Sequence, residues 1–65
     1  MTPREIRAEL ILRGINQRQI ADQLGVSESI ISHVISGRRR SDRIRRAIAR
    51  ALGKPVHRVF PDEVA

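Results

Sequence analysis

Apolar side chains recur at helical spacing in successive segments of this chain, and no stretch alternates with a period of two for long enough to predict a strand. The clearest pattern lies in the second half, where one face of a predicted helix is an apolar stripe. This stripe consists of Ile44, Ala47, Ile48, Ala51 and Leu52. The pattern predicts an all-α fold of four helices and a last short one.

The first predicted helix follows Thr2 and runs to about Arg13, just before Gly14. Thr2 can accept a hydrogen bond at the helix start, Pro3 suits the first helical turn, and Glu5 completes a capping box. These residues together mark where the helix begins.

Ile6 and Leu10 define the inner face of this helix, and Ile11 and Leu12 widen its apolar arc. We expect one of Ile11 and Leu12 to be partly exposed. An exposed apolar side chain is common on protein surfaces and needs no special role. The alternative is a contact with a second copy of the chain.

Two short helices are predicted at 17–24 and 28–36, with a tight turn at Gly25 between them. Glycine suits this turn because the left-handed backbone conformation carries no side-chain penalty there. Asn16 and Ser27 can cap the two helices. The second helix places apolar residues inward and short polar residues outward, which suits insertion into a groove. The outward residues are Ser27, Glu28, Ser29, Ser32 and His33.

A basic loop without apolar residues, at 37–41, separates the helix pair from a long helix that Ser41 or Asp42 caps. The last short helix lies within 54–61, between two prolines. Its apolar residues are expected to close the core; they are Val56, Val59 and Phe60.

The chain has 65 residues, which favours one domain spanning 1–65 with a single small core. It contains no cysteine, so neither a disulfide framework nor a thiolate metal site is expected. No apolar run approaches the roughly 20 residues of a membrane span, and no signal peptide is recognisable. These features predict a soluble cytoplasmic protein.

Thirteen basic residues against seven acidic ones give a net charge of +6, and twelve of the thirteen are arginine. The arginines could merely solubilise a small domain, or they could bind a polyanion, because guanidinium groups fit phosphates and guanine edges. Their positions favour phosphate binding, because five of them cluster after the helix pair. These five are Arg38, Arg39, Arg40, Arg43 and Arg46. The single aromatic residue, Phe60, argues against single-strand binding by base stacking.

The helix pair and the long helix carry a specific set of residues. They are Gln17, Ile20, Ala21, Leu24, Gly25, Val26, Ser27, Ile31, Ser32 and Val34, then Gly37, and then Ile48, Ala49, Ala51, Leu52 and Gly53. With them, nearly the whole chain resembles the lambda-repressor-like, Cro/C1-type (XRE) helix-turn-helix domains. The segments 6–14 and 59–61 are also similar to the small phage Ner-like regulators. The resemblance implies a compact five-helix domain with a central helix-turn-helix at 17–36, whose third helix enters the DNA major groove.

This resemblance also implies two sets of DNA-binding residues. The base-reading set is Ser27, Glu28, Ser29, Ser32 and His33. The phosphate-binding set is Asn16, Gln17, Arg18, Arg38, Arg39, Arg40 and Arg43. Arg43 occupies a position from which some relatives approach the minor groove.

Two features depart from the family pattern. Glu28 stands where relatives often have glutamine, and its carboxylate could either accept a bond from a cytosine amino group or stabilise the helix N-terminus. Leu10 and Ile35 occupy positions where many relatives carry a charged pair. We expect core contact to replace that pair, an exchange that is often neutral or stabilising.

His33 and His57 are the only histidines, and neither has cysteine or carboxylate partners at ligand spacing. The serines have no neighbouring base that could activate a nucleophile. We therefore expect no metal, no cofactor, no small-molecule ligand and no enzymatic activity.

The sequence thus predicts a sequence-specific regulator of double-stranded DNA, a repressor of phage, prophage or bacterial type that acts at the nucleoid. We expect no effector domain, so regulation would follow from occupancy of the DNA. A homodimer through the C-terminal helix and tail, with Phe60 and Val64, is expected, although a monomer is conceivable. The alternative is an antitoxin-type or excision-directing protein that acts through a protein partner. A pure protein-interaction module is a further alternative, against which the basic loop argues.

Overall fold

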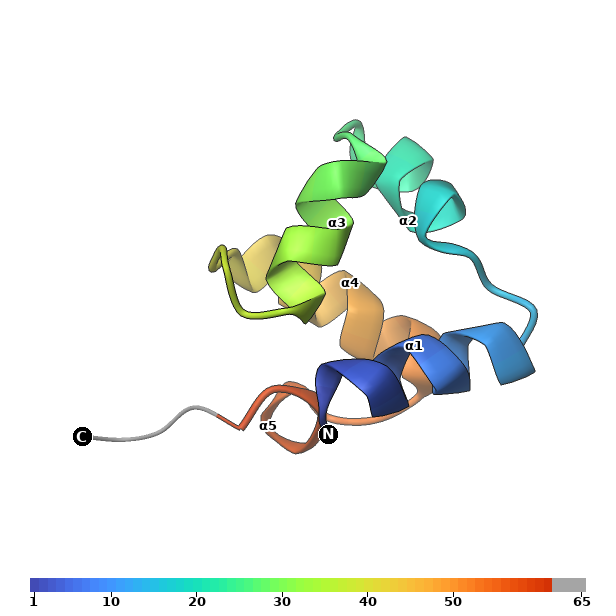
Figure 1. The fold of residues 1–65 in the computed structure, drawn as a ribbon, viewed down its shortest axis with the longest axis vertical. Coiled ribbons are helices and arrows are strands. Elements are labelled where there is room, and N and C mark those ends of the chain that lie inside the picture. Colours follow the sequence, from blue (N-terminus) through green and yellow to red (C-terminus); the bar gives the residue numbers. More distant parts are fainter. Residues whose placement is uncertain (62–65) are drawn as a thin grey trace.

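The computed structural model describes residues 1–61, and the regular structure of this part is entirely helical (Figure 1). Five helices follow one another along the chain, which confirms the predicted all-α fold. They are α1 (Pro3–Leu12), α2 (Gln17–Leu24), α3 (Glu28–Ile35), α4 (Asp42–Leu52) and α5 (Val56–Val59). The helices α1 and α3 each end one residue earlier than predicted, because Arg13 and Ser36 form their C-caps.

The start of α1 is the capping box that the sequence predicts. Thr2 Oγ1 accepts a hydrogen bond from the Glu5 backbone N–H at 3.1 Å, and the Thr2 N–H donates to the Glu5 carboxylate at 2.7 Å. Hydrogen bonds from the Thr2 backbone and side chain lower the pKa of the Glu5 carboxyl. Because the folded-state pKa is the lower one, this stabilisation is present at neutral pH and is lost as the pH falls through that pKa.

Side-chain caps also define the starts of the next three helices. Asn16 and Gln19 form a second capping box, with bonds of 2.7 and 2.9 Å. Ser27 caps α3, and Ser41 rather than Asp42 caps α4, each through a bond of 3.3 Å from its hydroxyl oxygen to a backbone N–H. The starts of these four helices therefore depend on hydrogen bonds between residues three positions apart in the sequence.

The long helix α4 is the centre of the fold, because it packs against each of the other four helices (Figure 1). Its Ile48 and Leu52 are fully buried. The predicted stripe needs one correction: Ala49 is buried, whereas Ala47 and Ala51 are only half-buried. A helix with neighbours on several sides buries a wider arc than a single stripe.

The core is aliphatic at the two positions where the sequence resemblance implies a charged pair in many relatives. Leu10 of α1 and Ile35 of α3 are both buried in one apolar cluster, as expected. Among residues 1–61, no polar or charged residue is buried. Tertiary packing, rather than ion pairing, therefore joins α1 to α3.

The short helix α5 has no side-chain cap, because Pro55 stands at its N-cap. The N-terminal ammonium group donates to the carbonyl oxygens of Arg58 and Val59, at 3.1 and 3.3 Å. The beginning of α1 therefore lies beside α5, as Figure 1 shows. Phe60 closes the core at 8% exposure, with the guanidinium carbon of Arg45 lying 5.1 Å from its ring centroid.

Two large apolar side chains remain outside the core. Ile11 is 76% exposed and Leu12 is 81% exposed, at the end of α1. The expectation that only one of them would be partly exposed is therefore wrong. On the same helix, Ile6 and Leu10 are the residues that face the core.

The turn between α2 and α3 makes a specific demand on Gly25, whose φ is +69°. No atom lies within 4 Å of the position a Cβ would take, so a substitution meets no steric obstacle there. Replacing Gly25 with alanine is expected to cost about 1–2 kcal/mol, which is the backbone penalty of a left-handed L-residue. Urea unfolding would measure this cost. Asparagine, which tolerates this conformation, should cost less, and equal costs for both variants would contradict the backbone explanation.

Candidate nucleic-acid interface

The helix α3 presents a polar face to solvent over an aliphatic back. Ile31, Val34 and Ile35 are buried and hold the helix against the core. The outward residues predicted from the sequence are exposed, except that Ser32 is half-buried; they are Ser27, Glu28, Ser29, Ser32 and His33. This arrangement leaves short, uncharged side chains in front of a rigidly packed helix, with Glu28 as the one acidic group.

A hollow of about 450 Å³ lies where the end of α1, the start of α2 and the start of α3 meet. Asn16, Gln17 and Glu28 line it, and so does Arg7 of α1. Predicted phosphate-binding and base-reading residues are thus adjacent in space at this end of α3. Arg18, in the first turn of α2, is exposed. The side-chain oxygen of Asn16 already accepts the Gln19 N–H, and its NH₂ group is left to donate to another partner.

The basic loop closes the other end of α3. The carbonyl oxygen of His33 accepts hydrogen bonds from the backbone N–H groups of Arg38 and Arg39, at 2.9 and 3.2 Å. All three loop arginines are exposed. Arg40 pairs with Asp42 at 3.3 Å, and because both side chains are more than 60% exposed this pair is weak. Arginines therefore stand directly after the C-terminus of α3.

Comparison with known proteins decides what this arrangement is. A family model described as helix-turn-helix matches residues 6–58, which is most of the chain. The chain belongs to the Cro/C1-type helix-turn-helix family. No curated protein and no solved structure matched it.

Membership of this family identifies the chain as a DNA-binding transcriptional regulator. The family binds DNA and is not usually enzymatic. DNA is accordingly a partner of this chain. None of the helices described is both long and apolar enough to cross a membrane.

Arg43 is placed differently from the other predicted phosphate-binding arginines. Its guanidinium group donates to the carbonyl oxygen of Leu24 at 2.9 Å. Leu24 ends α2, where carbonyl groups lack helical partners and where a positive charge is favourable. Arg43 therefore connects the start of α4 to the end of α2, beside the turn of the helix-turn-helix.

Replacing Arg43 with alanine is expected to lower the free energy of unfolding by about 0.5–1 kcal/mol, which is less than the roughly 1.5–3 kcal/mol of a buried charge-assisted bond because the side chain is exposed. Chemical denaturation would measure the loss. Lysine at this position keeps a charge and a donor, so Arg43→Lys should recover part of the stability. An unchanged unfolding midpoint in Arg43→Ala would show that the bond to Leu24 contributes nothing.

Sequence reasoning missed one residue at this surface, Arg7. Its Nη2 donates to the hydroxyl oxygen of Ser32 on α3, at 3.4 Å, across 25 positions of sequence. No local sequence pattern distinguishes Arg7 from the other arginines of the first helix region, Arg4 and Arg13. Only the packing of α1 against α3 brings it to the recognition face.

The histidines are exposed and far apart in sequence. Within residues 1–61, no group of three histidine, cysteine or acidic side chains is placed to hold a metal ion. His33 lies on the outward face of α3, whereas His57 belongs to α5.

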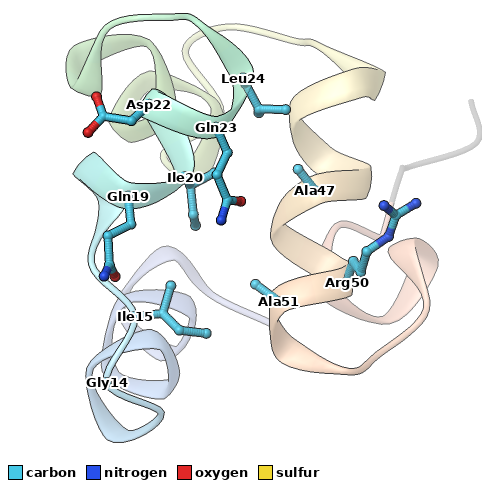
Figure 2. A pocket seen from close by; sticks show the side chains of 10 residues that line it. All are labelled: Gly14, Ile15, Gln19, Ile20, Asp22, Gln23, Leu24, Ala47, Arg50 and Ala51. Carbon is cyan, nitrogen blue, oxygen red and sulfur yellow. The ribbon is translucent and has the colours of Figure 1, made fainter.

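A larger hollow of about 830 Å³ separates α2 from α4 (Figure 2). Ala47 and Ala51 face Ile20 and Leu24 across it, and their small side chains leave it open. Polar residues form its rim; they are Gln19, Asp22, Gln23 and Arg50. This hollow explains why two alanines of the predicted stripe remain half-buried.

Proposed function

We propose that this chain is a sequence-specific regulator of double-stranded DNA, a repressor of phage, prophage or bacterial type, that inserts α3 into the major groove. The observation that carries the proposal is the order of surfaces along α3. Its polar front is bordered at one end by the start of α2 and at the other by the loop arginines. Contacts to phosphates on both sides of a groove would fix the helix between them.

The two proposed sets of DNA-binding residues have different roles, one in base recognition and the other in phosphate binding. Ser27, Glu28, Ser29, Ser32 and His33 are the base-reading set, on the outward face of α3. Asn16, Gln17, Arg18, Arg38, Arg39, Arg40 and Arg43 are the phosphate-binding set. The base-reading face adds little positive charge of its own, so most of the affinity would come from the phosphate-binding set, whose contacts carry no sequence information directly.

Repression would follow from occupancy. A bound copy in a promoter blocks polymerase or a competing protein, without any other activity of the chain. Such a role places the protein in the cytoplasm, at the nucleoid.

The proposed homodimer needs a surface on each copy, and two-fold pairing would place half-sites about one helical turn apart. The ring of Phe60 leaves little for such a contact, because it is only 8% exposed. Val64 lies outside the described residues. Light scattering with and without a selected duplex would measure the number of copies bound.

A second candidate function is that of an antitoxin-type or excision-directing protein with a protein partner. The exposed side chain of Leu12 favours it, since this residue has no place in the DNA contacts proposed. A neighbouring gene for a toxin or a recombinase would support this alternative.

The proposal is tested by binding to a library of random duplexes at 50 and 200 mM salt. If about six to ten phosphates are neutralised, affinity should fall roughly a thousandfold or more between these concentrations. Sequencing the duplexes retained at the higher salt should reveal a preferred site. Absence of binding at 50 mM salt would refute the proposal, and binding without any preference would refute its sequence specificity.

A further inference from the structure

The bond between Arg7 and Ser32 joins a scaffold helix to the recognition face. Arg7 is half-buried on α1, Ser32 is half-buried on α3, and the Nη2 to Oγ distance is 3.4 Å. Arg7 also lines the hollow shared with Gln17 and Glu28. Arg7 therefore lies where α1, α2 and α3 meet, with its guanidinium group beside Ser32.

The chemistry of this bond restricts the Ser32 hydroxyl. A hydroxyl has one O–H donor and two acceptor lone pairs, whereas guanidinium has only donors. The oxygen of Ser32 therefore accepts from Arg7, and its proton must point elsewhere. Within residues 1–61, no protein acceptor takes that O–H, so the donor is free to face a ligand.

We propose that Arg7 is a positioning residue for base recognition, which presents the Ser32 hydroxyl to DNA as a hydrogen-bond donor. This inference rests on the proposed function and names what Ser32 reads. A directed donor matches a base acceptor in the major groove: the N7 of a purine, the O6 of guanine or the O4 of thymine. Arg7 takes one of the two lone pairs, so the amino group of cytosine, which is itself a donor, could use only the remaining one and is the poorer partner.

A phosphate contact by Arg7 itself is the competing explanation. A guanidinium group that binds phosphate lowers affinity for every sequence alike when removed, and reduces the salt slope by about 1. A residue that acts through Ser32 changes the preference at one base pair instead. The two roles therefore differ in sequence discrimination rather than in overall affinity.

The experiment uses the full chain and a duplex selected by the unaltered protein. Each base pair of that duplex is varied, and the position whose preference is relaxed by Ser32→Ala is identified. At that position, Arg7→Met should reduce discrimination against a cytosine on the contacted strand by about 2- to 12-fold, the range of one hydrogen bond. The double variant should lose no more than Ser32→Ala alone, because both changes remove the same interaction.

Two further variants separate positioning from charge and from folding. Lysine has donors and no acceptor, so Arg7→Lys should restore part of the discrimination. Arg4 is exposed on the same helix, and Arg4→Met removes the same charge; it should leave the base preference unchanged. Melting curves identify any variant that has lost its fold, and in that case Arg7→Lys carries the test, with discrimination intermediate between those of the unaltered protein and Ser32→Ala.

The outcomes are distinct. Equal loss on all sequences with a reduced salt slope in Arg7→Met would assign Arg7 to phosphate and overturn the inference. A lower melting temperature with unchanged preference would also overturn it, since the bond would then be only structural. If the unaltered protein selects no duplex at all, the proposed function itself fails. If the unaltered protein selects a duplex and Arg7→Met keeps the same base preference, only the proposed role of Arg7 is refuted.

Discussion

Replacing Ile48 with alanine is expected to lower the free energy of unfolding by about 2–5 kcal/mol, through lost burial and the cavity left behind. Ile48 is fully buried on α4, the helix that packs against all the others. A domain of this size has a total stability of about 3–10 kcal/mol, at 0.05–0.15 kcal/mol per residue. The variant should therefore be partly unfolded at 37 °C. Urea titration followed by circular dichroism measures the loss.

The matched control is Leu12→Ala, which removes a large apolar side chain that is 81% exposed. It is expected to change stability by less than about 0.5 kcal/mol. If Leu12→Ala were as costly as Ile48→Ala, and the cost depended on protein concentration, Leu12 would lie in an interface between copies. A loss below about 1 kcal/mol for Ile48→Ala would contradict the central role of α4.

Replacing Arg38 and Arg39 together with glutamine is expected to reduce the salt slope of DNA binding by about 1.8, or about 0.9 for each phosphate contact. Extrapolated from 1 M salt, this corresponds to a loss of affinity of roughly 200-fold at 50 mM. Both side chains are exposed in the loop whose backbone is hydrogen-bonded to His33 at the end of α3. Fluorescence anisotropy with the selected duplex, across a series of salt concentrations, gives the slope directly.

The control for this pair is Arg4→Gln with Arg58→Gln, which removes the same charge from α1 and α5. Its slope should change by much less than about 1.8, because these residues are distant in sequence from the loop and belong to neither set of DNA-binding residues. Equal effects of the two double variants would show that net charge, rather than the position of the loop, determines the affinity. Arg40 is left intact because it already shares its charge with Asp42.

These expectations follow from a division of labour in the helix-turn-helix. The back of α3 is aliphatic, and Leu10 and Ile35 are both buried in one apolar cluster. The front of α3 holds serines, a histidine and one glutamate. Most of the affinity for DNA would then come from the arginines that follow α3, while the side chains of α3 would determine the sequence preference.

Much of this fold was predictable because its helix ends are determined by near neighbours. Thr2 with Glu5, Asn16 and Ser27 act within three residues of themselves, and Gly25 meets a local backbone demand. Such contacts can be read from a linear sequence, since both partners stand in the same short window. The two sets of DNA-binding residues rest on the family pattern, and the structure leaves nearly all of them at the surface.

What only the tertiary structure decided involves partners that are distant in sequence. Arg7 reaches Ser32 across 25 positions, and Arg43 reaches Leu24 across 19. The burial of Ala49 and the exposure of Leu12 likewise depend on which neighbours surround each helix. Periodicity determines which residues share a helix face, but the angle and distance between packed helices determine what that face meets. The sequence by itself therefore determined the helices, their caps and the arginine-rich loop, whereas packing decided which arginine of α1 contacts α3.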